Sequence, residues 1–216
     1  MTDAPDRAPG ASARFAAVLS YARPRDVPPG IDPDEFRLAL LEDTYEVVAG
    51  LELVTSALVL DPPDQPDAEA VTWPGTPIVR EATLTGAFAA LHALGAESAA
   101  LVAPDAPDLP PLLLGKLFRA LGGAPSAACQ AEDGTLVALA AALPLPDWLA
   151  AALRDVDLDT PGALARLRAA APRPGLMPQG PGWHRQRTTG DLRLLDPGLE
   201  GWENTRALLQ GHPLSS

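Results

Sequence analysis

The chain contains little of what several common protein classes require. Its 216 residues include one cysteine, Cys129, so an internal disulfide framework is excluded, and the apolar neighbours of Cys129 favour a buried thiol. The sequence has no G-x-G-x-x-G motif, no G-x-S-x-G motif and no zinc-type spacing of cysteine and histidine. These absences argue against a dinucleotide fold, a serine hydrolase and a zinc protein. They agree with a reducing compartment, and we expect a cytoplasmic protein.

Basic residues are scarce as well. There are 16 Lys and Arg against 28 Asp and Glu, which gives a formal net charge of −12, and Lys116 is the only lysine. Nucleic acid is not an expected partner, because sequence-independent binding requires many cations on phosphates. No apolar run reaches membrane-spanning length, and the first residues lack the apolar core of a signal peptide, so we expect no membrane association.

The domain organisation follows from the distribution of apolar residues, proline and glycine. Aromatic residues make up 5% of the chain and hydrophobic residues 47%, so the core must consist mainly of Ala, Leu and Val. We expect a loose N-terminal arm over 1–14 and one folded domain over 15–171. Over 172–216 the abundance of Pro and Gly predicts an extension with a short helix.

Predicted strands and helices alternate along the chain. Continuous apolar runs predict strands at 15–21, 54–60 and 98–103 and a short edge strand at 71–73, and the runs 126–130 and 136–142 could pair through an Asp-Gly turn. Helical spacing and end signals predict helices at 33–49, 82–94, 110–121, 146–153, 161–170 and 204–210. This alternation predicts an α/β fold with a mixed, mainly parallel sheet between helical layers.

Carboxylates follow the ends of several predicted core elements. They are Asp105 and Asp108 after strand 98–103, Glu132 and Asp133 after run 126–130, and Asp155, Asp157 and Asp159 before helix 161–170. Ligands of open α/β sheets bind at the carboxyl ends of strands. Hard cations such as Mg²⁺ bind there through a few carboxylates and the substrate phosphates. The pattern therefore indicates a crevice that holds a metal and a phosphorylated ligand.

Each of these carboxylates also has a structural interpretation. Asp159 suits the N-cap of helix 161–170, and Asp108 suits the cap of the helix that follows Pro110. Asp133 and Gly134 suit a reverse turn. A solvated loop accounts for the others, so the residues alone leave both interpretations open.

Three segments in order, APDAPDL, AEDGTLVAL and RDVDLDTPGALARL, resemble the nucleotide-diphospho-sugar transferase superfamily over residues 15–170. The nearest resemblance is to bacterial glycosyltransferase-like proteins related to molybdenum-cofactor guanylyltransferases and phospholactate guanylyltransferases. It implies a three-layer, Rossmann-like glycosyltransferase-A fold. It also implies a transferase, nucleotidyl or glycosyl, that acts on a nucleotide or nucleotide sugar and an acceptor of unknown identity.

The resemblance also implies roles for particular residues. Asp105 corresponds to an aspartate that holds Mg²⁺ or Mn²⁺ on the nucleotide phosphates, and Asp133 or Asp157 is the second metal-ligand candidate. Substrate-binding candidates in the same segments are Asp108, Glu132 and Gly134. Thr135 stands where the family usually has a second glycine.

The loop after the first strand departs from the family. Active members resembling this chain carry a glycine-rich, basic loop there, whereas this chain has YARPRDVPPGIDPDEF, with four acids and no lysine. Arg23 and Arg25 are candidate phosphate contacts or plain surface arginines. An acidic loop opposes a triphosphate unless cations intervene. A degenerate phosphate loop keeps a second hypothesis open, a non-catalytic relative that serves in binding or assembly.

Residues 161–190 contain five arginines and no acid. Arg185 and Arg187, beside Trp183 and His184, could bind an anionic ligand, since arginine presents a planar fork to phosphate and Trp a stacking face. The alternative is that these arginines form a solvated helix face and a tail that neutralises acidic neighbours.

Overall fold

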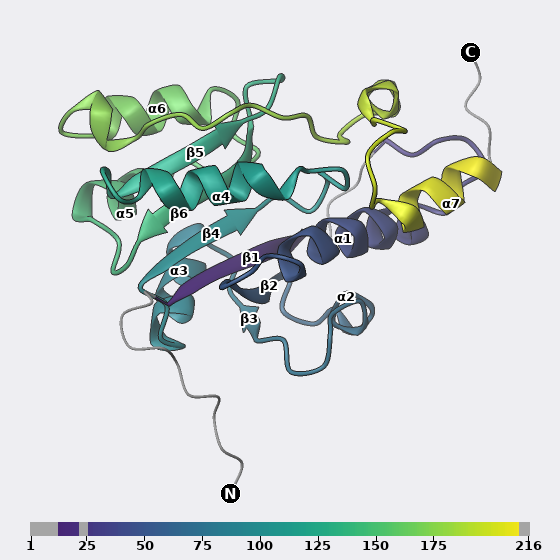
Figure 1. Cartoon of the computed structure of the whole chain (residues 1–216), viewed down its shortest axis with the longest axis horizontal. Helices are drawn as coiled ribbons and strands as arrows, with labels where there is room; N and C mark the ends of the chain where they lie inside the picture. The colour runs from purple at the N-terminus through teal and green to yellow at the C-terminus, as the bar shows by residue number, and fades with distance from the viewer. Residues whose placement is uncertain (1–12, 22–25, 212–216) are drawn as a thin grey trace, which may run out of the picture.

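One sheet, ordered β3-β2-β1-β4-β6-β5, forms the centre of the computed structural model of this chain, which describes residues 13–21 and 26–211 (Figure 1). Its strands are β1 (Arg14–Tyr21), β2 (Thr55–Asp61), β3 (Ile78–Arg80), β4 (Ser98–Val102), β5 (Ser126–Gln130) and β6 (Leu136–Ala142). The pairs β1–β2, β1–β4 and β2–β3 are parallel, and β6 is antiparallel to β4 and β5. The predicted mixed, mainly parallel sheet is confirmed.

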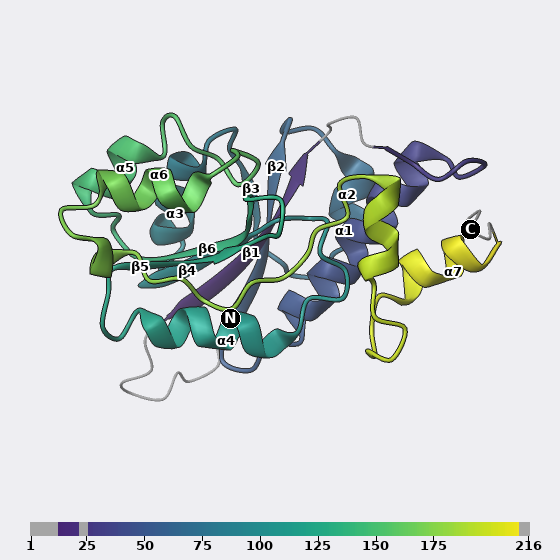
Figure 2. The ribbon, with the colours of Figure 1, turned by 90° about the horizontal axis from the view of Figure 1, so that it is seen from above.

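Helices cover both faces of the sheet, which gives three layers (Figure 2). On one face lie α1 (Pro33–Ala49) and α4 (Pro111–Ala120), and on the other lie α3 (Leu84–Ala93), α5 (Asp147–Ala152) and α6 (Ala163–Ala170). The strands alternate their side chains between two alanine- and leucine-rich clusters. The small side chains on the strands let both helical layers pack closely on the sheet.

Local signals account for several element boundaries. Asp32 caps α1, because its Oδ1 accepts hydrogen bonds from the backbone N–H of Asp34 at 2.9 Å and Glu35 at 3.1 Å. The predicted pairing of 126–130 with 136–142 is confirmed, with Ala128 opposite Leu139. The turn between these strands contains Gly134 at φ +83°, a conformation that glycine adopts without strain.

The predicted edge strand at 71–73 is wrong. A short helix, α2 (Pro66–Ala70), precedes these residues, and the edge strand β3 comes later, pairing with Leu58 to Leu60 of β2. The physical reason is a turn anchored on α1. The Tyr45 hydroxyl accepts from the backbone N–H of Trp73 at 3.1 Å and lies 2.6 Å from Thr76 Oγ1, and Gly75 adopts φ +88° between them.

The C-terminal residues lie on the domain over much of their length. We call residues 178–196 the strap. It follows a 3₁₀ turn (Pro174–Leu176), runs beside β5 through the bridges Ala128–Gln179 and Ala131–Trp183, and ends after a second 3₁₀ turn (Thr189–Leu194). Helix α7 (Glu203–Gly211) then packs against α1 (Figure 1).

The ends of the chain bear on two other expectations. Of the predicted arm over 1–14, residues 1–12 lie outside the described residues, and Arg14 already belongs to β1. In the described part of the chain, no helix has the length and apolar character needed to cross a membrane.

Candidate functional site

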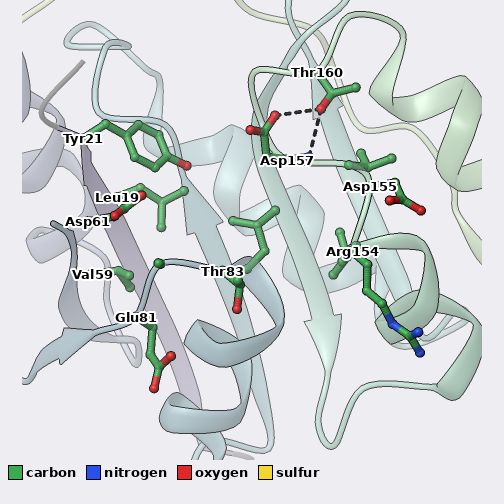
Figure 3. A pocket seen from close by; sticks show the side chains of 14 residues that line it. Leu19, Tyr21, Val59, Asp61, Glu81, Thr83, Arg154, Asp155, Asp157 and Thr160 are labelled. Atoms are coloured by element: carbon green, nitrogen blue, oxygen red, sulfur yellow. Dashed lines mark hydrogen bonds between the residues drawn. The ribbon is translucent and has the colours of Figure 1, made fainter. Parts of the chain in front are cut away.

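The crevice of this sheet lies where its strand order reverses. From β1 the chain proceeds to β2 and β3 on one side, then crosses to β4 on the other, and open sheets bind ligands at the carboxyl ends of strands at such a point. A pocket of about 310 Å³ opens there (Figure 3). It is lined by Leu19, Tyr21, Val59, Asp61, Glu81, Ala82, Thr83, Leu84, Leu153, Arg154, Asp155, Val156, Asp157 and Thr160.

The pocket is lined by buried apolar side chains and by partly or fully exposed carboxylates, and we call these carboxylates its rim. Four carboxylates, those of Asp61, Glu81, Asp155 and Asp157, line it together with three hydroxyl groups, and Arg154 is the one basic side chain among the described lining residues. Carboxylates and hydroxyls accept hydrogen bonds from sugar hydroxyls and base amino groups. The pocket thus suits the nucleoside or sugar part of a ligand better than its phosphates.

Asp157 and Thr160 form one wall of the pocket. The Thr160 hydroxyl donates to Asp157 Oδ1 at 2.7 Å and accepts from the Asp157 backbone N–H at 3.0 Å, which fixes this turn (Figure 3). Opposite it lie Tyr21 and Asp61 at the ends of β1 and β2. Of the predicted metal-ligand candidates, Asp157 is the one that lines this pocket.

Asp105 lies beside the crevice but is fully buried. Arg185 of the strap approaches it with two parallel hydrogen bonds, Nε to Oδ1 at 2.6 Å and Nη2 to Oδ2 at 3.0 Å. The backbone N–H of Gln186 donates to the Asp105 carbonyl at 2.7 Å. This bidentate geometry is the strongest form of arginine–carboxylate pairing.

The Arg185 guanidinium remains charged in this buried position. Burial alone lowers its pKa, but the charges of Asp105 and Asp159 and their hydrogen bonds raise the pKa above the ordinary arginine value. Asp159 Oδ1 lies 2.7 Å from Arg185 Nη2 and 2.7 Å from Arg187 Nη1. For Arg185 and Arg187, the structure therefore agrees with a tail that neutralises acidic neighbours.

Asp108 is a second buried carboxylate bound by the strap. It accepts from Trp183 Nε1 at 3.1 Å and from the backbone N–H of Asp196 at 3.2 Å, and it lies 2.9 Å from His184 Nε2. The expected capping role is wrong, because α4 has Pro110 as its N-cap residue, without a side-chain cap in the described structure. The Asp108 carboxylate therefore accepts hydrogen bonds from the strap and not from the first backbone N–H groups of α4.

Asp159 is not a helix cap either. Helix α6 begins at Ala163 with Gly162 as its N-cap residue, and the Asp159 carboxylate contacts arginines instead. The capping prediction failed because the arginines come from a segment distant in sequence.

Asp133 and Gly134 form the turn before β6. Asp133 Oδ1 accepts from the backbone N–H of Thr135 at 2.9 Å and from its hydroxyl at 2.5 Å. Arg187 Nε lies 3.6 Å from Asp133 Oδ2. Glu132 is exposed and lines a separate open hollow beside Trp183 and His184.

The residues at this crevice do not fit a resident divalent cation. Among the described residues, no group of three or more His, Cys, Asp or Glu side chains is placed to hold a metal ion, so Asp105, Asp133 and Asp157 do not form such a group. Both carboxylate oxygens of Asp105 are bound to Arg185. A metal at Asp105 would have to displace a buried guanidinium.

One basic residue near the strand ends escaped the sequence analysis. Arg37 of α1 lines a small hollow with Ser20, Tyr21 and Pro104, and its buried Nη1 has no hydrogen-bond partner among the residues described. Its position within the apolar run FRLALL offered no signal. Arg23 and Arg25, the predicted phosphate contacts, lie outside the described residues.

Comparisons with known proteins agree with this fold. No protein-family model matches the chain, and no curated protein matches it in sequence. A candidate nucleotide-diphospho-sugar transferase from Desulfovibrio desulfuricans G20 is similar in structure, with a TM-score of 0.64 and 14% identity over 93% of this chain and 98% of its own. A 4-diphosphocytidyl-2C-methyl-D-erythritol synthase from Anaerococcus prevotii DSM 20548 has a TM-score of 0.56 and 14% identity over 92% and 96%.

At these identities the likeness shows the fold and not the activity. The chain thus has the mixed α/β fold, with a mainly parallel sheet, of nucleotide-diphospho-sugar transferase-like proteins, as predicted.

Proposed function

We propose that this protein binds a nucleotide or nucleotide sugar in the 310 Å³ pocket and transfers its nucleotidyl or glycosyl group to an acceptor. The observation that carries this proposal is the position of the pocket at the carboxyl ends of β1 and β2, beside the strand-order reversal. Its volume lies at the lower end of the range of about 300–1,000 Å³ typical of small-molecule sites. The two similar structures are named as a candidate nucleotide-diphospho-sugar transferase and a diphosphocytidyl-methylerythritol synthase, and these names support a ligand of this class.

The side chains that line the pocket indicate where the base and the phosphates of the ligand would lie. A base would lie on the apolar residues Leu19, Val59 and Leu84, with hydroxyl or amino groups donating to Asp61 and other rim carboxylates. The phosphates would extend past Tyr21, which also lines the hollow of Arg37. Among the described residues, Arg37 is the cation best placed to receive them, because its Nη1 is buried and has no hydrogen-bond partner there.

Thermal melting of the full chain with nucleosides, nucleotides and nucleotide sugars, each with and without Mg²⁺ or Mn²⁺, tests this proposal. A ligand present at ~100 times its dissociation constant adds about 2.7 kcal/mol to the free energy of unfolding. Ala82→Trp should abolish the shift, because Ala82 is exposed and lines the pocket, whereas Ala89→Trp, at an exposed site on α3 away from the pocket, should retain it. No shift with any compound would contradict the proposal.

Arg37→Met separates the phosphate contact from the nucleoside contact. We expect roughly 10-fold or greater loss of nucleotide affinity by calorimetry, since a hydrogen bond to a charged group contributes about 1.5–3 kcal/mol, with nucleoside affinity unchanged. An equal loss for nucleoside and nucleotide would place the phosphates elsewhere.

A second candidate function is favoured by the burial of Asp105 against Arg185. A relative whose strand-end carboxylate is neutralised by its own chain could bind a nucleotide without turnover and act in binding or assembly. Incubation with bound nucleotide or nucleotide sugar and a mixed pool of phosphorylated and sugar acceptors distinguishes the two. Release of pyrophosphate or nucleoside diphosphate supports the transferase, and binding without release supports the second candidate.

A further inference from the structure

The Arg185 guanidinium is surrounded by oxygen atoms of the kinds that hard cations bind. Its three nitrogens face Oδ1 and Oδ2 of Asp105, Oδ1 of Asp159, the carbonyl oxygens of Leu136 and Leu158 at 3.1 and 3.2 Å, and the Thr135 hydroxyl at 3.4 Å. Every one of these partners is an oxygen, and carboxylate, carbonyl and hydroxyl oxygens are what Mg²⁺ and Mn²⁺ bind in proteins. A guanidinium therefore fills an oxygen-lined space.

The strap holds Arg185 there firmly. The Arg185 side chain is 1% exposed, and the next residue donates its backbone N–H to the Asp105 carbonyl. Before it, the backbone N–H of Trp183 donates to the Gln130 carbonyl at 3.2 Å, and after it Arg187 binds Asp159. Contacts on both sides of Arg185 thus keep its guanidinium at the strand ends.

We infer that Arg185 is an internal cation which takes the place of a divalent metal at Asp105 and Asp159. This inference concerns the chain's own residues and does not depend on the ligand proposed above. A divalent cation at Asp105 would meet like charge from Arg185 at contact distance, where both side chains are buried and bulk solvent screens the repulsion little. The carboxylates are therefore neutralised by the protein, and the crevice needs no Mg²⁺ or Mn²⁺ for that purpose.

Paramagnetic broadening by Mn²⁺ alone tests the inference on the full-length, ¹⁵N-labelled protein without any nucleotide. The reporters are the backbone amides of Ala106 and Gln186. Ala106 follows Asp105 in the sequence, and the Gln186 amide donates a hydrogen bond to the Asp105 carbonyl. In the wild type these signals should keep their intensity at equimolar Mn²⁺. Their selective, saturable loss at one equivalent of Mn²⁺ would overturn the inference.

Arg185→Ala provides the complementary measurement. Removal of the guanidinium leaves the oxygen-lined space free, so the same two amides should now broaden at equimolar Mn²⁺, and Tm should rise with added Mn²⁺. Arg173→Ala, which removes an exposed arginine just before the strap, should behave as the wild type. A folded Arg185→Ala protein that binds no Mn²⁺ at these amides would also overturn the inference. If that variant does not fold, the wild-type titration still decides.

Discussion

Asp108 shows how a single residue can join the strap to the domain. Its carboxylate is buried and lies within hydrogen-bond distance of the two aromatic side chains of Trp183 and His184, whose rings stack with centroids 4.7 Å apart. It also accepts from the backbone of Asp196, at the end of the strap. Three hydrogen-bond donors of the strap therefore share the buried Asp108 carboxylate as their acceptor.

Asp108→Ala should lower the free energy of unfolding by at least about 2 kcal/mol, because buried donors left without acceptors lose their solvation as well as their hydrogen bonds. Urea denaturation measures this change. Asp108→Asn keeps one carbonyl oxygen as an acceptor and should lower the free energy of unfolding by less. Asp64→Ala, which removes an exposed carboxylate, serves as the control, and an equal effect of both alanine variants would contradict the structural role of Asp108.

At the scale of elements, the strap lies so close to β5 that a side chain at Gly182 would crowd the strand. A Cβ atom added at Gly182 would lie 3.1 Å from the Gln130 carbonyl oxygen, whereas one added at Gly175 would meet nothing within 4 Å among the described residues. The Cys129 thiol donates to the Pro181 carbonyl at 2.7 Å, and burial raises the pKa of this thiol to about 12. Cys129 is thus a buried thiol, as predicted, and it lies directly beneath the strap.

Gly182→Ala should increase the rate at which Cys129 reacts with a thiol reagent under native conditions. The added methyl group weakens the contact between strap and β5, and each 1.4 kcal/mol of weakening raises the open population about tenfold. Stopped-flow labelling at neutral pH measures the rate. Gly175→Ala should leave it unchanged, and equal rates in wild type and Gly182→Ala would show that the strap does not govern access to Cys129.

The contact between α1 and α7 concentrates negative charge. Asp43 accepts from the backbone N–H groups of Asn204 and Thr205 at the start of α7, yet burial raises its pKa. Glu46 is largely exposed, but partial burial, followed by the charges of Asp43, Glu42 and Glu203, raises its pKa above 4.5. Ionisation of these groups therefore opposes the folded state.

Glu46→Gln should raise Tm at neutral pH by a degree or so, because it removes this opposition. An acid with a raised folded pKa binds more protons in the folded state, so stability falls as pH rises from the unfolded pKa through the folded one. The Tm difference between the variant and the wild type should thus vanish below about pH 4.5 and reach its full size at neutral pH. Glu52→Gln, beyond the end of α1, is the control. A Tm advantage of Glu46→Gln that persists at pH 4 would contradict this explanation.

At the scale of the whole molecule, the elements follow from local signals. The Asp32 cap, the Asp-Gly turn and the apolar strand runs act within a few residues, so helix α1 and the β5–β6 pair form where they were predicted. The edge strand was misplaced because Tyr45 of α1 anchors the 73–76 turn across about 30 residues of chain. Such a distant contact leaves no mark on the local pattern.

The strand-end location of the carboxylates was predictable, but their contacts were not. The carboxylates after β4 lie at the strand ends, as the apolar run before Asp105 indicated. Arg185, the partner of Asp105, lies 80 residues further along the chain, and no periodicity relates the two. The arginine excess over 161–190 indicated a cation, with an anionic ligand and neutralisation of acids as open alternatives, and the fold brings Arg185 to Asp105 and Asp159.

The position of the strap beside β5 also limits how this protein can associate with other chains. An uncovered outer strand presents free backbone donors and acceptors, to which a strand of another molecule can add. Here the backbone of β5 is already paired with Gly180 and Trp183, and the strap itself contains Pro178 and Pro181, which have no N–H to offer. The segment that supplies the buried guanidinium thus also protects this side of the sheet from intermolecular β-addition and aggregation.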